Sequence, residues 1–419
     1  MSSESITSQT QLNELCTRLA EARRIAFDTE FVSEYTYRPE LCLVQVAAEL
    51  DGEPLLLAVI DPLAGLDLKP FWEVLADGNH ETIVHAGRQE FLFCYEAINR
   101  RPHALFDVQI AAGLVGNEYP AGYGNLLSRY LGKSLQKGET RTDWRRRPLS
   151  HHQLEYALDD VRYLLELQQK LVERLDRLNR RRWMSEEMES WQKDLESSLS
   201  EQQWRRVSGI GRLKSRELAI VRELWGWRED ECRRTNKPPR QVLRDDLIVE
   251  LARRRTSDAK RIVAVRGFER RNFRRVVPQI GDAIERALKL PQAQCPLPTR
   301  RDNGNNQRGP LGQFLTSALS SICQAAEVAP ALVGTASDVR DLIAYRLGEW
   351  DNGDGPPSLA RGWRAEVIGK TLDDLLNGKL IIRIVDPRAD QPLSFEPYPG
   401  PEAQSSEDPA ESSGNSQTQ

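Results

Sequence analysis

Two acidic residues, Asp28 and Glu30, lie two positions apart in the largely apolar stretch Phe27–Phe31. Because side chains alternate along a β-strand, a strand here would present both carboxylates on one face and their neighbours on the other. Carboxylates held side by side repel each other unless a cation lies between them. The pair therefore suggests a divalent-cation site, although such acidic pairs are also common at exposed strand ends.

A second acidic feature lies further along the chain, where Tyr156 precedes Asp160 by four residues. On a helix these two side chains share a face and lie one turn apart, whereas Asp159 points elsewhere. A phenol and a carboxylate stacked in this way can hold a water molecule while the carboxylate also reaches a metal ion. The alternative interpretation is a surface aspartate that follows an aromatic core residue.

A third feature is the sequence His85-Ala86-Gly87 with Glu90 three residues later. The glycine indicates a strand end that turns into a helix. Glu90 then lies near the helix N-terminus, where the helix dipole favours an anion. By itself this is an ordinary arrangement for the start of a helix.

The periodicity of apolar residues predicts the elements that position these acids. Three runs, residues 24–31, 41–48 and 54–61, are separated by breaks short enough for antiparallel strands. A helix-like stretch at 71–76 precedes another apolar run at 82–87. From residue 91 to about 175 the spacing becomes helical, as at Leu105, Ile110 and Leu114. Strands followed by helices predict an α/β domain over residues 1–175.

The rest of the chain is predicted to be mostly helical. A charged helical connector over 176–202 leads to a helical module over 203–290, and a Pro- and Asn-rich linker over 291–310 follows. A third unit over 311–395 has helical periods and one late strand-like run. Residues 396–419 hold five acidic residues and no basic ones, and we expect them to be disordered.

The net charge of −4 conceals an uneven distribution of charge along the chain. Residues 201–290 carry 24 Lys and Arg against 13 Asp and Glu, a net charge of +11, and the remaining residues carry 34 against 49, a net charge of −15. A basic segment joined to an acidic remainder suggests a module that binds a polyanion such as nucleic acid. An Arg-rich helical surface that is merely solvated would show the same counts.

Composition narrows the classes of function. The chain has 419 residues, 39% of them hydrophobic, and no run approaches the length of about 18 apolar residues that a membrane span needs. Its first ten residues lack the basic and apolar regions of a leader peptide. The six cysteines and five histidines are dispersed without metal-ligand spacing. We therefore expect a reducing, cytoplasmic location, no membrane partner, and a metal, if any, held by carboxylates.

Taken in order, the Asp-x-Glu strand, the His-Ala-Gly turn with its acid and the Tyr-x-x-x-Asp helix resemble the DEDD-type 3′→5′ exonucleases with a tyrosine in the third motif. Within that group the closest resemblance is to the ribonuclease D family. It covers residues 24–170 and rests on the segments Asp28–Phe31, Leu41–Val46, His85–Gly87, Leu131–Lys133, Thr142–Trp144, Arg147–Ser150 and Gln153–Val161.

The resemblance implies a ribonuclease H-like fold and a reaction that uses two divalent cations, Mg²⁺ or Mn²⁺. Carried over by position, the cation ligands would be Asp28, Glu30, Glu90 and Asp160, and Tyr156 would orient the attacking water. Glu90 stands where the family has aspartate. Its extra methylene displaces the carboxylate, and a misplacement of about 1 Å can slow a reaction on the order of 10²-fold.

Three other residues of this region have weaker interpretations. Lys133 and Lys137 would contact phosphates, although a loop lysine is often only solvated. Asp107 is another acid near the motifs, and we expect it to start a helix.

Residues 203–290 resemble the HRDC domain (helicase and RNase D C-terminal), on the segments Leu218–Arg228, Pro238–Leu243 and Ile262–Phe268. The expected core residues are Leu224, Trp225, Val242, Leu243, Leu247 and Leu251. The expected phosphate contacts are Arg233, Arg234, Lys237, Arg240, Arg244 and the run Arg253–Arg255, and their binding would be mostly independent of sequence. Residues 311–395 are compatible with a second, diverged HRDC-like unit.

The sequence thus predicts an α/β protein: a ribonuclease H-like mixed sheet with flanking helices, then an all-α HRDC bundle, then a smaller, mostly helical C-terminal unit. The predicted function is 3′→5′ exoribonuclease activity that releases 5′-mononucleotides, in the 3′ processing of tRNA precursors and other structured RNA. No obligate protein partner is evident. The alternatives are a DNA 3′→5′ exonuclease and, because of Glu90, a catalytically weak RNA-binding protein.

Overall fold

The computed structural model describes residues 4–116, 118–135, 142–199, 201–268, 275–298, 309–350 and 355–400. The chain forms two compact units. The first comprises Met1–Ala112 with Ala121–Gly304, and the second comprises Gly113–Pro120 with Asn305–Gln419.

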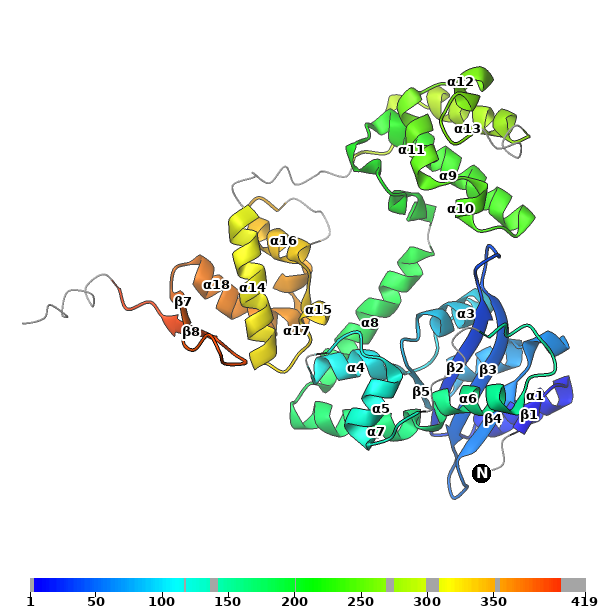
Figure 1. Cartoon of the computed structure of the whole chain (residues 1–419), viewed down its shortest axis with the longest axis vertical. Helices are drawn as coiled ribbons and strands as arrows, with labels where there is room; N and C mark the ends of the chain where they lie inside the picture. The colour runs from blue at the N-terminus through cyan, green and yellow to red at the C-terminus, as the bar shows by residue number, and fades with distance from the viewer. Residues whose placement is uncertain are drawn as a thin grey trace, which may run out of the picture. The chain divides into compact units, whose positions relative to one another are not determined.

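A six-stranded mixed sheet lies at the centre of the N-terminal region (Figure 1). Its spatial order is β1-β4-β3-β2-β5-β6. The predicted antiparallel arrangement of the three early strands is confirmed, because β3 pairs antiparallel with both β2 and β4. The other pairs are parallel. The strands are β1 (Glu4–Ile6), β2 (Arg24–Val32), β3 (Glu40–Glu49), β4 (Leu56–Ile60), β5 (Glu81–Val84) and β6 (Leu105–Asp107).

Helices cover both faces of this sheet, and β2 shows why. Phe27 points to the face covered by α2, where its ring meets Phe71 and Trp72 edge-on at 6.1 and 6.2 Å. Asp28 therefore points to the opposite face, on which α6 packs against β2, β3 and β4. The helices of this region are α1 (Gln9–Leu19), α2 (Lys69–Asp77), α3 (Arg88–Ile98), α4 (Val108–Leu114), α5 (Tyr123–Leu131), α6 (His151–Arg162) and α7 (Leu164–Arg177), with the 3₁₀ turn η1 (Pro62–Ala64).

The helical spacing predicted from residue 91 onward is wrong at Leu105. This residue lies in the short strand β6, and α4 begins only at Val108. The apolar residues of a three-residue strand and of the helix directly behind it happened to fall on one helical period. The strand β1, also three residues long, was too short to give a periodic signal.

The predicted connector and helical module form α8 (Arg181–Ser198) and a bundle around α9. Four of the expected core residues, Leu224, Leu243, Leu247 and Leu251, are buried, while Trp225 and Val242 are only partly buried. The elements of the bundle are η2 (Glu201–Arg206), η3 (Ile210–Arg212), α9 (Ser215–Thr235), α10 (Pro239–Val242), α11 (Asp245–Arg254), α12 (Ala259–Val263), α13 (Val277–Lys289) and η4 (Gln292–Gln294).

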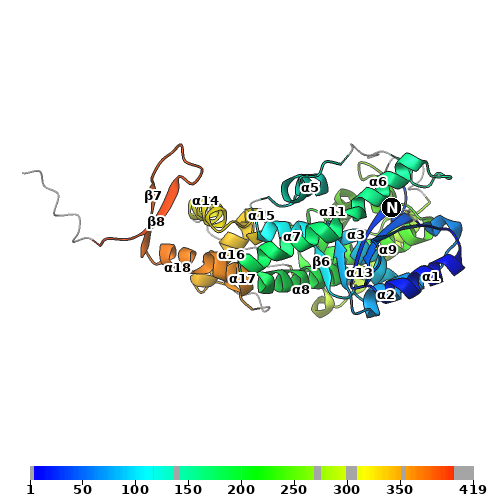
Figure 2. The same cartoon turned by 90° about the horizontal axis from the view of Figure 1, so that it is seen from below.

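The second unit is mainly helical and ends in a β-hairpin, β7 (Leu380–Ile384) with β8 (Leu393–Pro397) (Figure 2). The hairpin accounts for the strand-like run of the sequence. The disorder predicted from residue 396 onward is wrong for Glu396 and Pro397, because both belong to β8. Residues 401–419 of the predicted tail lie outside the described residues. The helical elements are α14 (Gly309–Ala325), α15 (Pro330–Val333), α16 (Ala336–Arg346), η6 (Ser358–Ala360), α17 (Gly362–Arg364), the π-helical turn η7 (Ala365–Gly369) and α18 (Lys370–Leu376).

The segment Gly113–Pro120 belongs to this second unit although it lies far away in sequence. The Ala329 N–H donates a hydrogen bond of 2.8 Å to the Gly113 carbonyl oxygen. Throughout the described part of the chain, helices that combine the length and the apolar character of a membrane span are absent.

Candidate active site and basic pocket

Asp28 and Glu30 occupy the middle of β2, on the face covered by α6. In the antiparallel register Asp28 lies opposite Gln45 of β3 and Glu30 lies opposite Leu43. A bulge follows directly, between Glu30 and Phe31. The regular alternation thus holds through both acids, as the sequence predicted, and both carboxylates are half-buried beneath α6.

Helix α6 supplies the tyrosine and the third acid. It begins at a capping box, in which the Ser150 hydroxyl accepts a hydrogen bond from Gln153 N at 3.2 Å and Ser150 N donates to Gln153 Oε1 at 2.8 Å. Tyr156 and Asp160 follow on the same helix, one turn apart, and they interact: the Tyr156 hydroxyl lowers the pKa of the Asp160 carboxyl, and Asp160 raises the pKa of Tyr156. The predicted i, i+4 pair therefore exists.

The neighbours of this pair hold it in place. The Trp144 ring stacks on the Tyr156 ring with 6.2 Å between the centroids. Asp159 turns away, as predicted, and pairs with Arg162 at 2.5 Å.

The turn before α3 is held by Asp107. Ala86 has a positive φ of 54°, and a Cβ added to Gly87 would lie only 2.2 Å from a Val84 methyl carbon. The buried Asp107 carboxylate accepts hydrogen bonds from the N–H groups of Ala86 and Gly87, at 3.1 and 2.9 Å. It also accepts one from Gln109 N at 2.8 Å, which confirms its expected place at a helix start. Asp107 thus has two roles, and the sequence predicted only one.

Glu90 lies in the first turn of α3, with 5% of its surface exposed. The Thr29 hydroxyl donates a hydrogen bond of 2.5 Å to Glu90 Oε1. Thr29 belongs to β2 and lies between the two acids of that strand. The longer side chain is therefore held against the same strand that carries Asp28 and Glu30.

The pKa values show that the four carboxylates share one electrostatic environment. Burial raises the pKa of Asp28 well above its ordinary value, and Glu90, Asp160 and Glu30 raise it further. Burial, followed by Asp160 and Glu90, raises the pKa of Glu30 to about 8. The pKa values of Asp160 and Glu90 rise to about 7, in both cases chiefly through burial. Acids distant in sequence are thus brought close enough to repel each other.

Two further polar side chains lie in this environment and were missed by the sequence analysis. Tyr123 of α5 contacts the His85 ring at 5.5 Å, and burial, Asp160 and Asp28 all raise its pKa. Gln45, the cross-strand neighbour of Asp28, is fully buried. Gln45 stood out as a polar residue in an apolar strand and lies in the segment Leu41–Val46 that resembles the family, but neither signal gave it a role, and Tyr123 gave no signal beyond its glycine neighbours.

The donor set fits divalent cations in its chemistry. Mg²⁺ and Mn²⁺ prefer hard oxygen ligands, and a cation would relieve the repulsion that raises these pKa values. Across the described residues, no group of three or more His, Cys, Asp or Glu side chains already has the arrangement of a metal site. The carboxylates are therefore gathered but not arranged as a finished chelate.

Of the two lysines predicted to contact phosphates, the structure describes only Lys133. Lys133 pairs with Glu166, and its ammonium lies over the Tyr163 ring, 4.2 Å from the centroid. Lys137 lies outside the described residues.

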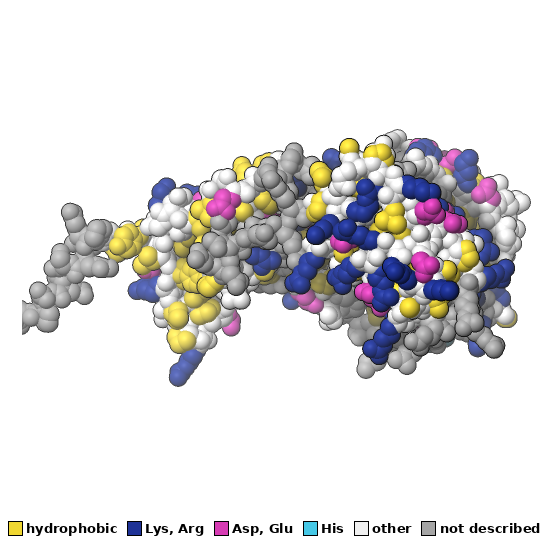
Figure 3. All heavy atoms as spheres, turned by 90° about the horizontal axis from the view of Figure 1, so that it is seen from above, with side chains coloured by type: hydrophobic (Ala, Val, Ile, Leu, Met, Phe, Trp, Pro, Cys, Tyr) yellow, Lys and Arg dark blue, Asp and Glu magenta, His cyan; other side chains and the backbone are white. Residues whose placement is uncertain are grey.

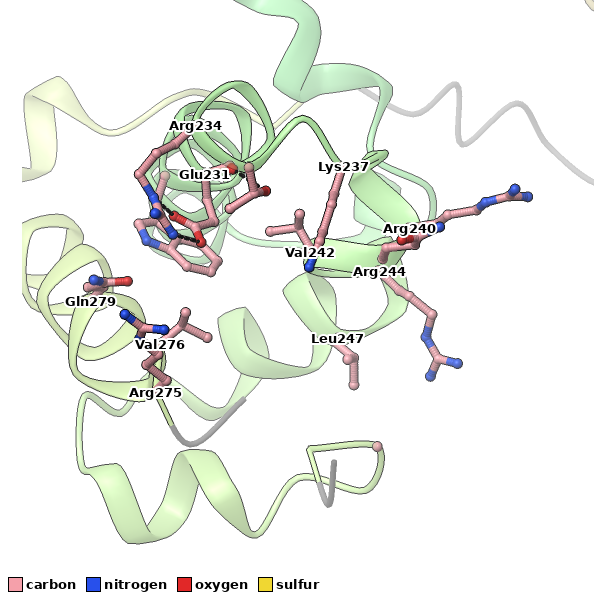
Figure 4. A pocket seen from close by; sticks show the side chains of 14 residues that line it. Glu231, Arg234, Lys237, Arg240, Val242, Arg244, Leu247, Arg275, Val276 and Gln279 are labelled. Carbon is pink, nitrogen blue, oxygen red and sulfur yellow. Dashed lines mark hydrogen bonds and ion pairs between the residues drawn. The ribbon is translucent and has the colours of Figure 1, made fainter. Parts of the chain in front are cut away.

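The HRDC-like bundle carries a basic pocket of about 630 Å³ (Figure 4). Four of the predicted phosphate contacts line it: Arg234, Lys237, Arg240 and Arg244. Arg275, Gln279 and the half-buried Trp227 also line the pocket and were not predicted. Arg233 does not line it and pairs with Asp230 at 2.9 Å.

Some of the basic side chains that line the pocket are already paired with acidic neighbours. Arg234 forms two hydrogen bonds with Glu231, of 2.8 and 2.5 Å, and Arg244 pairs with Asp246 at 2.9 Å. Lys237 and Arg275 have no ion-pair partner among the residues that the structure describes. Lys and Arg side chains gather on the face seen in Figure 3.

Comparison with known proteins matches two families on this chain. A family described as 3′–5′ exonuclease matches residues 3–176, and the HRDC domain family matches residues 217–284. The first match contains all four carboxylates and Tyr156, and the second contains Arg233 and all the residues that line the pocket.

Similar proteins cover nearly the whole chain. The ribonuclease D of Sphingobium indicum is 34% identical over 392 residues, covering 91% of this chain and 97% of its own length. That of Zymomonas mobilis is 34% identical over 393 residues, covering 90% and 95%. The crystal structure of Escherichia coli RNase D has a TM-score of 0.78 at 27% identity and covers 90% of this chain and 99% of its own. With its acids gathered around β2 of a mixed sheet and an HRDC bundle following in the sequence, the chain belongs to the ribonuclease D family of 3′→5′ exonucleases.

Proposed function

We propose that this protein hydrolyses RNA from the 3′ end, releases 5′-mononucleotides and uses two divalent cations, Mg²⁺ or Mn²⁺. The observation that carries the proposal is that Glu90 and Asp160 lie close enough to Asp28 and Glu30 to raise their pKa values, with Tyr156 next to them. The alternatives left open by the sequence, DNA hydrolysis and RNA binding with weak catalysis, predict different products in the experiment below.

The acids and the tyrosine would have different roles in this reaction. A bound pair of cations would supply Lewis acidity to the attacking water and to the leaving oxygen. Asp28, Glu30 and Asp160 are half-buried and reachable, so they would hold the cations directly. Tyr156 lies one helical turn from Asp160 and interacts with it, so the phenol can orient a water molecule at the edge of the site. Stacking on Trp144 limits the rotation of that phenol.

Glu90 need not disable the site. Its added methylene is accommodated by the short hydrogen bond from Thr29, which defines one position for the carboxylate. A carboxylate held in one position loses less entropy when it binds a cation than a freely rotating one. We therefore propose an active enzyme in which Glu90 contributes negative charge at the margin of the site.

The pocket on the HRDC-like bundle supports an RNA substrate. Lys237 and Arg275 can neutralise phosphates, and Trp227 offers an aromatic surface. The E. coli protein is described as an exoribonuclease involved in structured RNA processing. By analogy we propose that this protein trims structured RNA, including tRNA precursors, in the cytoplasm.

The test is to incubate the full chain with 3′- and 5′-labelled RNA and DNA of one sequence, with Mn²⁺, with Mg²⁺ or with a chelator. We expect labelled 5′-mononucleotide from 3′-labelled RNA at the earliest times, progressive shortening of 5′-labelled RNA, and neither product with chelator. Preferential hydrolysis of DNA would contradict the RNA assignment. RNA binding without any product would contradict the enzyme.

A further inference from the structure

Gln45 lies in the middle of β3 and is fully buried, with 0% of its surface exposed. Both its amide oxygen and its amide nitrogen lack a hydrogen-bond partner among the described residues. Buried polar groups in folded proteins are nearly always paired, because an unpaired one loses its hydrogen bonds to water without compensation. An unpaired amide at this position therefore calls for a functional explanation.

The strand register shows what the amide faces. Gln45 is aligned with Asp28 on one side and with Val59 of β4 on the other. Directly opposed side chains point to the same face of a sheet, with Cβ atoms about 4.5–5.5 Å apart. Val59 cannot form a hydrogen bond through its side chain, so Asp28 is the polar neighbour in this row. The face is the one on which α6 packs.

We propose that Gln45 is a positioning residue for the metal site: its amide N–H donates a hydrogen bond to the Asp28 carboxylate when that carboxylate holds a cation. A carboxylate has two oxygens, so one can bind the cation while the other accepts from the amide. Carboxylate ligands of metals are generally held by such a second partner, and loss of the partner weakens metal binding or activity about 10–100-fold. The inference rests on the cation site proposed above.

The chain offers a matched control in Thr82. Its hydroxyl is also fully buried and also lacks a partner in the described part of the chain. Thr82 lies in β5, in register with Ile25 of β2. Ile25 is three positions from Asp28, so it points to the opposite face of the sheet, away from the acids.

The experiment compares Gln45→Leu and Thr82→Val with the unmodified protein, using the full chain. Three quantities are measured: the Tm without metal, the affinity for Mn²⁺ in the absence of RNA by electron paramagnetic resonance, and the Mn²⁺ concentration that gives half-maximal hydrolysis. Both substitutions remove an unpaired buried polar group, so neither should lower the Tm. Only Gln45→Leu should weaken Mn²⁺ binding, about 10–100-fold, with a matching rise in the Mn²⁺ concentration required.

Unchanged Mn²⁺ affinity in Gln45→Leu would overturn the inference and leave the proposed function intact. An unmodified protein that does not bind Mn²⁺ would overturn the proposed function itself. If Gln45→Leu does not fold, Gln45→Met keeps the unbranched stem of glutamine and provides the same comparison. Equal weakening by Thr82→Val would also contradict the assignment, because it would show that any change in this sheet disturbs the site.

Discussion

The sheet of the exonuclease region and the HRDC-like bundle both concentrate charge, but they do so in opposite ways. The sheet gathers four carboxylates that are buried or half-buried, and burial is the first cause of each raised pKa. The pocket of the bundle presents four arginines and one lysine, all of which are exposed to water. Charge that is removed from water is costly unless a counter-ion stands at a defined place, whereas exposed charge costs little.

This difference predicts how each region responds to substitution. In the sheet, each acid is tied to a fixed geometry, so a single substitution should have a large effect on the rate. In the bundle, each cation adds a small and screened attraction, so several substitutions are needed and the effect depends on salt.

The largest effect is expected for Asp160→Asn. The substitution keeps the size of the side chain but removes a charge that a cation would need, so hydrolysis should fall by at least about 10²-fold. RNA affinity, measured by fluorescence anisotropy, should stay within about twofold. Single-turnover rates with 3′-labelled RNA give the first quantity.

Asp159→Asn is the control for this substitution, because Asp159 is the adjacent residue but pairs with Arg162 and points away. Its rate should remain within a few fold of the unmodified protein. If Asp160→Asn retained full turnover, Asp160 would have no place in the site.

A smaller effect is expected for the double substitution Lys237→Ala with Arg275→Ala. If each side chain contacts one phosphate, the slope of log affinity against log salt should become shallower by roughly 0.7 per contact for single-stranded RNA. The affinity should fall several-fold at low salt, and the rate at saturating RNA should not change. Filter binding over a range of salt concentrations measures the slope.

Arg233→Ala serves as the matched control for the bundle, because Arg233 lies on the same helix as Arg234 but outside the pocket. It should leave the salt slope nearly unchanged. Equal effects of the control and the double substitution would assign RNA binding to the general charge of the bundle instead of to the pocket.

The same contrast explains how far the sequence could predict the structure. Asp28 and Glu30 share a face because strand geometry is local, and Tyr156 contacts Asp160 because helix geometry is local. Gln45 could not be assigned to the site, because its role depends on the register between β2 and β3, which spacing along one strand does not specify.

Other omissions have the same origin. Arg275 enters the pocket only through the packing of the bundle, and Leu105 was assigned to a helix because a three-residue strand has no period of its own. The segment Gly113–Pro120 joins the second unit through contacts with residues more than two hundred positions away. Local pattern thus identified the chemistry, while tertiary neighbours decided which further residues take part.

The smallest effect concerns the dependence of stability on pH in the metal-free protein. The carboxyl groups of Glu30, Glu90 and Asp160 have pKa values of about 8, 7 and 7 in the folded protein, above the ordinary values near 4 that they regain on unfolding. The folded state therefore binds more protons than the unfolded state between about pH 4 and pH 8, and stability should fall as pH rises through this window. With chelator present, the Tm of the exonuclease region should drop by several degrees between pH 5 and pH 8, and saturating Mn²⁺ should reduce the drop by taking the place of the protons.

Glu30→Gln should remove the part of the decline nearest pH 8, because it removes the group with the highest of the three pKa values. A Tm that rises over this range in chelator would mean that the acids are not held against one another. Burying the acidic site would then not destabilise the fold, and the contrast with the exposed basic pocket would be wrong.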